Sequence, residues 1–253
     1  MAGVPEGRLH SLHYLGARLE ATLDCLHPPP RTKPLGFDEL VLHLETALGM
    51  GLDPFLDEPE VRALERRVET AATIDDPGPR AVHDAHPRLA RACYVLCRAL
   101  RPEVAVETGV ANGISSAFIL QALQANGSGE LHSIDLAPPG TDPALVGRFV
   151  PAELRVRWTL HRGASKEVLP GLARELGPIG MFVHDSRHTY RNVSRELRTV
   201  SPRLARPAAV VVDDAERHSA LQDWAAAAGA RPADLVEQPG KPALFGVALL
   251  GAG

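Results

Sequence analysis

The sequence predicts an α/β protein built on a doubly wound, mostly parallel sheet. Three observations carry this prediction. A short apolar segment, Val104–Val106, leads into a loop of small residues and then into a helical pattern, which together make a strand–loop–helix unit. From residue 104 onward, apolar strand segments alternate with helical ones. The first hundred residues show helical spacing without strand alternation, which predicts a helical prefix.

Four helices are expected in the prefix. Apolar residues recur at helical spacing over residues 9–26, and the run ends at Pro28–Pro30, which cannot continue a helix. Further helices are expected over residues 37–48, 58–73 and 87–100, with a break at Asp75–Pro79. We therefore divide the chain into a helical cap or lid, residues 1–87, and a sheet domain, residues 88–253. The cap is expected to contact substrate or to form a dimer surface.

The sheet domain follows in order. Strands are expected at residues 104–106, 131–135, 154–160, 179–185, 208–213 and 243–250, with helices at 115–126 and 220–228 among them.

Composition favours a globular enzyme acting on a small molecule. The net charge is −4 and the pI about 6.3, so no bulk attraction to nucleic acid or an anionic membrane is expected. Without a signal peptide or a membrane-spanning apolar run, a cytoplasmic protein is expected. Among three cysteines, Cys93 and Cys97 lie four apart on a predicted helix, where we expect buried packing residues rather than a metal pair.

The loop after the first strand has an unusual glycine spacing. Gly109 and Gly113 are separated by three residues, whereas a dinucleotide fingerprint reads Gly-x-Gly-x-x-Gly. Glu107 precedes the loop, and a carboxylate there would repel a pyrophosphate but attract a cationic ligand. The alternative is an ordinary strand–helix turn that binds nothing.

The stretch Glu107-x-Gly-x-x-x-Gly-x-Ser115 resembles motif I of the class I S-adenosylmethionine-dependent methyltransferases. This resemblance implies a Rossmann-like sheet of seven strands, the last of them antiparallel. It also implies that S-adenosylmethionine is bound by residues of the loop and its flanks, namely Glu107, Gly109, Ala111, Gly113 and Ser115.

Acidic residues follow the strands. Glu107, Asp135, Asp185 and the pair Asp213–Asp214 stand where the first, second, fourth and fifth strands end. Ligands of open α/β sheets bind beyond these carboxyl ends, and buried acids without partners would be costly. The acids are therefore expected to form one site.

The resemblance assigns further cofactor contacts. Asp135 would accept the ribose hydroxyls, with a helix N-cap or turn acid as the alternative. The turn Gly163–Ser165 would lie along the adenine, so Ala164 and Ser165 count as cofactor-binding residues, and Ser165 is also a plausible N-cap. Asp185 would border the cofactor as well.

Two segments, Phe182–Tyr190 and Val210–Asp214, resemble those of magnesium-dependent O-methyltransferases, including the catechol, caffeoyl-CoA and macrolide-sugar types. The resemblance implies that Asp185, Asp213 and Asp214 bind Mg²⁺, a hard cation that prefers oxygen ligands. The alternative is that Asp213 caps the next helix while Asp214 is solvated.

His188 matches the position of a lysine base in the catechol and caffeoyl-CoA types, so His188 and Asp185 are the expected catalytic residues. Arg187 departs from the family pattern, because an acid usually stands there. The arginines of the following segment suggest a solvated helix face that includes Glu196.

The function expected from these residues is S-adenosylmethionine-dependent O-methylation of a small molecule, assisted by Mg²⁺. Abundant Pro, Arg and Ala hint at specialised (natural-product) metabolism, and a homodimer or higher homo-oligomer is possible through the prefix. Three alternatives stay open: a metal-independent O- or N-methyltransferase, a non-catalytic methyltransferase-like binding module, and a dinucleotide-dependent oxidoreductase, against which Glu107 and the loop spacing argue.

Overall fold

The computed structural model describes residues 20, 22–29, 32–74, 84–137, 142–231 and 233–252. In these residues the chain forms one seven-stranded sheet in the order β3-β2-β1-β4-β5-β7-β6. Strands β1 to β5 pair in parallel, and β7 runs antiparallel to both β5 and β6. The predicted doubly wound sheet with an antiparallel last strand is confirmed. Its strands are β1 (Val104–Thr108), β2 (Glu130–Asp135), β3 (Trp158–Arg162), β4 (Ile179–His184), β5 (Leu204–Val212), β6 (Asp234–Gln238) and β7 (Lys241–Leu250).

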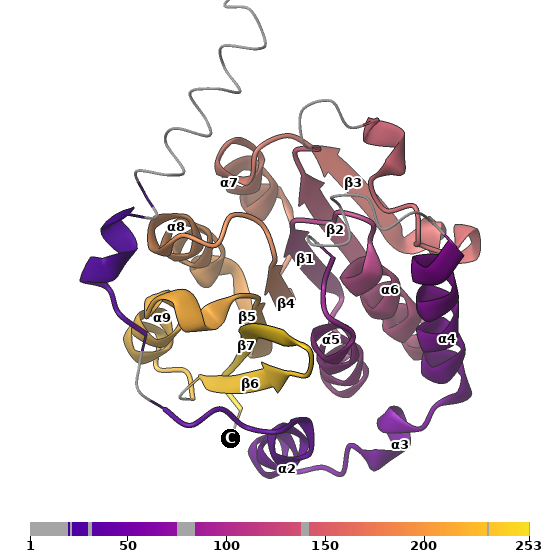
Figure 1. The fold of residues 1–253 in the computed structure, drawn as a ribbon, viewed down its shortest axis with the longest axis horizontal. Helices are drawn as coiled ribbons and strands as arrows, with labels where there is room; N and C mark the ends of the chain where they lie inside the picture. Colours follow the sequence, from indigo (N-terminus) through magenta and orange to yellow (C-terminus); the bar gives the residue numbers. More distant parts are fainter. Residues whose placement is uncertain are drawn as a thin grey trace, which may run out of the picture.

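Helices cover both faces of the sheet (Figure 1). Helices α5 (Pro87–Leu100) and α6 (Ile114–Asn126) pack on one face, where α2 (Phe37–Leu48) and α4 (Pro59–Ile74) share their apolar core. Helices α7 (Ser165–Glu175), α8 (Tyr190–Val200) and α9 (Ala220–Ala228) bury a second core against the other face. The all-buried strands β1 and β4 separate the two cores, as expected for central parallel strands.

The described part of the prefix is helical, as predicted. Helices α2 and α5 match their predicted bounds, α4 is shifted by one residue, and a short α3 (Asp53–Leu56) precedes α4. The helix predicted over residues 9–26 falls largely outside the described residues, and its end is a 3₁₀ turn, η1 (Asp24–Leu26). The break predicted at residues 75–79 also lies outside them. The division at residue 87 stays a prediction.

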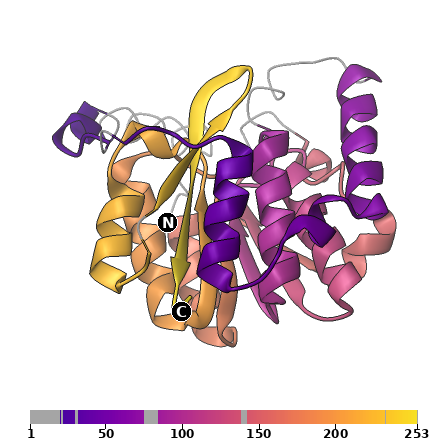
Figure 2. The ribbon, with the colours of Figure 1, turned by 90° about the horizontal axis from the view of Figure 1, so that it is seen from below.

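The prefix also reaches the edge of the sheet. Leu35 forms a parallel bridge with Val236 of β6, with its amide donating to Leu235 O and its carbonyl accepting from the Glu237 amide. Figure 2 shows α2 lying beside the β6–β7 hairpin. The segment before α2 therefore lies along the outer side of β6.

Two strand predictions need correction. The third strand was expected at residues 154–160, but residues 152–157 form a 3₁₀ segment, η4 (Ala152–Arg157), and β3 begins at Trp158. Val156 is 84% exposed, whereas Leu154 packs into the core from this turn, so the apolar residues do not mark a strand. Strand β6 was missed because its sequence carries acids and an amide, which suit a sheet edge.

The cysteines lie as predicted. Cys93 and Cys97 are free thiols fully buried in α5, and Cys25 is exposed. Among the helices described, none combines the length and apolar character that a bilayer crossing requires.

Candidate active site

Parallel pairing brings the predicted acids to one edge of the sheet. Strands β2, β1, β4 and β5 are neighbours and all point the same way, so their carboxyl ends share that edge. Asp135 ends β2, whereas Asp185 and Asp213 directly follow β4 and β5. The acids form two adjoining groups, one around the loop after β1 and one beyond β4 and β5.

Glu107 lies inside the protein beneath the β1–α6 loop. Its carboxylate accepts hydrogen bonds from the hydroxyls of Ser115 (2.5 Å), Ser116 (2.5 Å) and Ser133 (2.8 Å). Burial raises the pKa of Glu107, and the three hydroxyls oppose that shift. Glu107 is completely buried. Its hydrogen bonds connect β1 to the start of α6 and to β2, beneath the loop. A contact with a ligand's ammonium stays a prediction.

Asp135 organises the same loop from the end of β2. Its Oδ2 accepts from the amides of Val110 (2.7 Å) and Ala111 (3.2 Å), and its Oδ1 accepts from the Ala137 amide (2.7 Å). Burial raises the pKa of Asp135, while the loop amides lower it. The amides of Val110 and Ala111 in the loop thus donate to Asp135. Its ribose-binding role stays a prediction.

The glycines of the loop are required by close backbone packing. Gly109 (φ +85°) and Gly113 (φ +88°) occupy the left-handed region, and Ala111 between them does too (φ +47°). A Cβ on Gly109 would stand 2.0 Å from the Asp185 carbonyl oxygen, and one on Gly113 would stand 2.8 Å from Gly147 Cα. The loop after β1 therefore lies directly against the backbone at the end of β4, which joins the two acid groups.

Ser165 does not cap α7. The N-cap is Ala164, and the Ser165 hydroxyl instead donates to Glu196 of α8. The N-cap prediction for Ser165 was wrong because a buried carboxylate on the neighbouring helix offers its hydroxyl a stronger, charge-assisted acceptor. Ala164 and Ser165 still stand at the carboxyl end of β3, where we predicted an adenine contact that no observation yet tests.

Glu196 is the largest departure from the sequence analysis. It is 1% exposed rather than part of a solvated face. Its carboxylate accepts from five polar groups: Thr108 Oγ1 (2.6 Å), His184 Nδ1 (2.7 Å), Ser186 Oγ (3.0 Å), Asn192 Nδ2 (3.1 Å) and the Ser165 hydroxyl. The signal was present: Glu196 shares helical spacing with Val193 and Val200, both buried.

The buried pair of Glu196 and His184 is strongly polarised. Burial alone would raise the pKa of Glu196, but the neighbouring His184 and the hydroxyl donors lower it to about 2. His184 is fully buried, and its Nε2 is unpaired among the described residues. Its ring meets that of His188 edge to face, with centroids 5.6 Å apart.

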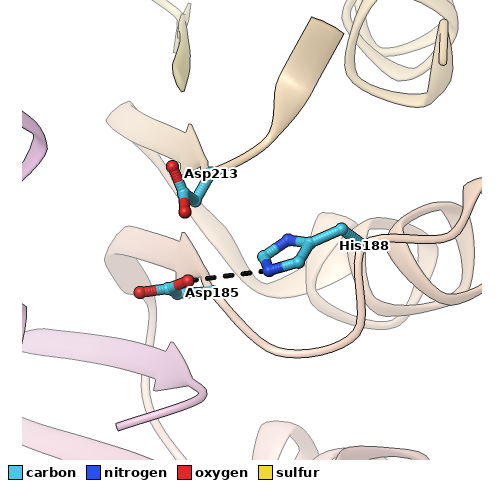
Figure 3. A group of neighbouring side chains, drawn as sticks. All are labelled: Asp185, His188 and Asp213. Carbon is cyan, nitrogen blue, oxygen red and sulfur yellow. Dashed lines mark ion pairs between the residues drawn. The ribbon is translucent and has the colours of Figure 1, made fainter. Parts of the chain in front are cut away.

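Asp185, His188 and Asp213 converge beyond β4 and β5 (Figure 3). One ligand atom from each lies within 4.8 Å of the others, and His188 Nε2 is 3.8 Å from Asp185 Oδ1. Burial, reinforced by Asp213, raises the pKa of Asp185 well above its ordinary value. Burial and the nearby His184 lower the pKa of His188 to about 4, so its imidazole is neutral at pH 7. The predicted catalytic pair is therefore brought together.

Lys241, the first residue of β7, was missed by the sequence analysis. Its Nζ lies 2.8 Å from Asp213 Oδ2 and 3.4 Å from Asp214 Oδ1. Burial acts to raise the pKa of Asp213, but Lys241, His188 and the Gln238 hydrogen bond together outweigh burial, so the pKa is lowered. The alternative, in which Asp213 caps the next helix and Asp214 is solvated, does not hold. The residue that precedes η6 (Ala215–Arg217) is Asp214 rather than Asp213, and the Asp214 side chain, on a residue in the left-handed region (φ +51°), is only 17% exposed. No local sequence motif predicts this contact, because Lys241 and Asp213 are brought together only by the pairing of β5 with β7.

The N-terminal segment reaches the loop that carries His188. Asp24 Oδ1 accepts from the Tyr190 amide (3.0 Å), the rings of His27 and Tyr190 stack with centroids 3.5 Å apart, and Arg187 Nη1 lies 3.6 Å from Glu20 Oε2. Arg187 is thereby turned toward the prefix. Glu20, Asp24 and His27 therefore lie beside the loop between β4 and α8.

Comparison with protein families gives a match over residues 106–215, to the model of a methyltransferase domain. This range begins in β1 and ends just beyond Asp214, so it contains every predicted site residue. Residues 106–215 therefore match a methyltransferase domain, in agreement with the resemblance of the loop after β1. No curated protein sequence matches the chain.

Solved structures share its fold. An O-methyltransferase from Bacillus cereus in complex with SAH is 13% identical, with a TM-score of 0.56, over 84% of this chain and 97% of that one. TomG, an O-methyltransferase from Streptomyces achromogenes involved in tomaymycin synthesis and solved with SAM, is 15% identical (TM-score 0.55; 84% and 96% covered). An SAH-bound methyltransferase from Podospora anserina is 13% identical (TM-score 0.52; 87% and 98% covered).

Proposed function

We propose that this protein transfers a methyl group from S-adenosylmethionine to an oxygen of a small-molecule acceptor. The observation that carries the proposal is the meeting of two acid groups at one sheet edge, with Gly109 packed against the Asp185 backbone between them. A donor held at the first group would adjoin an acceptor held at the second. The O-methyltransferases among the structural neighbours support oxygen as the methyl acceptor.

On the donor side, we assign the loop after β1 and the ends of β2 and β3 to the cofactor. Asp135 stands at the carboxyl end of β2, with its carboxylate oriented by three amides, so it is fixed in place to accept ribose hydroxyls. Glu107 holds Ser115 and Ser116 and so fixes the start of α6 behind the loop. These groups are already ordered by internal hydrogen bonds. Binding of the cofactor therefore costs little conformational entropy in this loop.

On the acceptor side, we assign His188 as the group that takes the acceptor's hydroxyl proton at Nε2, with Asp185 beside it. The imidazole is neutral at pH 7 and stands at the strand edge rather than on the outer surface. The protein's further task is to align the acceptor oxygen with the donor methyl and to exclude water.

The residues present also fit a divalent ion. Carboxylates are the ligands that Mg²⁺ prefers, and Asp185 and Asp213 face each other. Asp214 Oδ1 is buried and accepts no hydrogen bond in the described part of the chain, although Lys241 is near. We propose that these three acids hold the ion, which leaves the His188 imidazole for proton transfer. A bound ion would lower the pKa of an acceptor hydroxyl.

The division between donor and acceptor groups is tested by calorimetric titration with S-adenosylhomocysteine. We expect Asp135→Asn to weaken binding by at least about tenfold, because one lost charge-assisted hydrogen bond costs about 1.5–3 kcal/mol. Asp213→Asn should stay within about twofold of the wild type. Equal loss in both variants, or no binding by the wild type, would contradict the assignment.

A further inference from the structure

Lys241 lies against two of the three acids that we assign to the divalent ion, Asp213 and Asp214. We propose that the Lys241 ammonium competes with the divalent ion for Asp213 and Asp214, which directly follow β5. The ammonium pairs with these acids when no ion is bound, and it must leave them when an ion binds. Lys241 would thereby set the metal occupancy of the protein. The inference rests on the metal site proposed above.

The ammonium is held on the acids that the ion needs. Lys241 Nζ contacts Asp213 at 2.8 Å and approaches Asp214 to 3.4 Å, and the Asp213 side chain is only 4% exposed. Its Oδ2 is engaged by Lys241, while its Oδ1 accepts from Gln238 Nε2 at 3.1 Å. Asp213 is thus fully partnered without any ion, and Lys241 supplies its charge balance.

The lysine comes from a firmly placed hairpin. It directly follows the turn at Pro239–Gly240 between β6 and β7, and His86 Nε2, at the N-cap of α5, lies 3.1 Å from the Pro239 carbonyl oxygen. The backbone of Lys241 is therefore fixed near the acids. Its side chain is 29% exposed, so the flexible four-carbon stem can carry the ammonium toward solvent.

Simultaneous binding of both cations to Asp213 is unfavourable. Mg²⁺ binds a carboxylate oxygen at about 2.0–2.1 Å, and Lys241 already uses one Asp213 oxygen. An ammonium that close to a divalent ion would be strongly repelled, even at the effective dielectric of a protein surface. The three acids face two cationic side chains, Lys241 and Arg217, whose Nη1 lies 3.3 Å from Asp214 Oδ2, so a divalent ion can bind these acids in exchange for the Lys241 ammonium.

The test measures Mn²⁺ binding to the S-adenosylhomocysteine-loaded protein by electron paramagnetic resonance of the free ion, so no acceptor is needed. We expect Lys241→Met to bind Mn²⁺ at least about tenfold more tightly than the wild type, because the competitor is gone. Lys241→Arg, which keeps the charge, should bind no more tightly than the wild type. Lys33→Met is the matched control for loss of one exposed lysine and should leave binding unchanged.

The outcomes separate this inference from the proposals on which it rests. If the wild type and Lys241→Met bind Mn²⁺ equally, the competitor role is wrong while the metal site stands. If neither binds Mn²⁺, both the competitor role and the metal site are wrong, and S-adenosylhomocysteine titration still decides the donor site. Should Lys241→Met fail to fold, Lys241→Gln provides the same comparison with a polar side chain.

Discussion

Single buried residues hold the site together. Glu196 lies on α8 yet receives hydrogen bonds from β1, β4, α7 and the loop after β4, which are the elements that carry or flank the predicted site residues. We infer that Glu196 positions the loop containing Asp185 and His188, since Ser186 and Asn192 bind the same carboxylate. An acid so placed contributes to stability only while it is ionised.

Glu196→Gln tests this at the residue scale. The pKa of Glu196 is lowered from 4.5 to about 2 in the folded protein, so its stabilising effect is present above about pH 4.5 and is lost as the pH falls toward 2. We expect the variant to lose on the order of 3 kcal/mol of unfolding free energy at neutral pH, since a buried carboxylate that accepts several hydrogen bonds loses its charge.

Urea denaturation across this pH range measures the effect. The deficit of Glu196→Gln should shrink as the pH falls below about 4.5. Glu237→Gln, on the exposed side of β6, should cost less than about 0.5 kcal/mol. A deficit that did not change with pH would mean that Glu196 acts through its shape rather than its charge.

At the scale of elements, the site depends on two loops that touch. The loop after β1 passes so close to the loop after β4 that no side chain fits between them at Gly109. The donor group and the acceptor group therefore cannot move apart independently without opening this contact.

A pair of glycine variants isolates that contact. Gly109→Ala and Gly127→Ala both force alanine into the left-handed region, at φ +85° and +73°, but only the Gly109 variant meets other atoms, because nothing lies within 4 Å of a Cβ at Gly127. We expect Gly127→Ala to cost about 1 kcal/mol. Gly109→Ala should cost at least about 2 kcal/mol more and weaken S-adenosylhomocysteine binding. Similar thermal unfolding of the two variants would show that the loops separate easily.

At the scale of the whole molecule, the N-terminal segment turns back toward the loop between β4 and α8, whereas helix α5 lies deep in the core. This arrangement separates the three cysteines. Cys25 is exposed within η1, and Cys93 and Cys97 are fully buried in α5, where burial raises the pKa of both thiols. The thiolate is the reactive form of cysteine. The two buried thiols therefore react slowly for two reasons: reagents cannot reach them, and their raised pKa keeps them protonated.

Labelling with Ellman's reagent checks this arrangement. We expect Cys25 to be the one thiol that reacts rapidly in the native protein, and all three to react after denaturation. Cys25→Ser should abolish the rapid phase. Rapid labelling of that variant would mean that α5 is far less tightly packed than its burial indicates.

Local sequence patterns predicted most of the fold and part of the candidate site. The bounds of α2, α5 and α9 followed from helical spacing and turn residues, and the order of strands brought the acids to one edge. What the sequence could not provide are contacts between distant segments, such as Lys241 with Asp213 or Asp24 with Tyr190. Such contacts depend on the register of the β6–β7 hairpin and on the path of the prefix, which no short motif specifies. A dimer surface on the prefix stays a prediction.

The bridge between Leu35 and Val236 covers part of the edge of the sheet at β6. A strand at the border of a sheet offers unpaired amides and carbonyls to any extended chain, which invites aggregation. Here the Leu235 carbonyl and the Glu237 amide are already occupied by Leu35 of the same chain. Strand β6 is thereby shielded from edge-to-edge association, and a second molecule that added a strand in register would first have to peel the segment before α2 away.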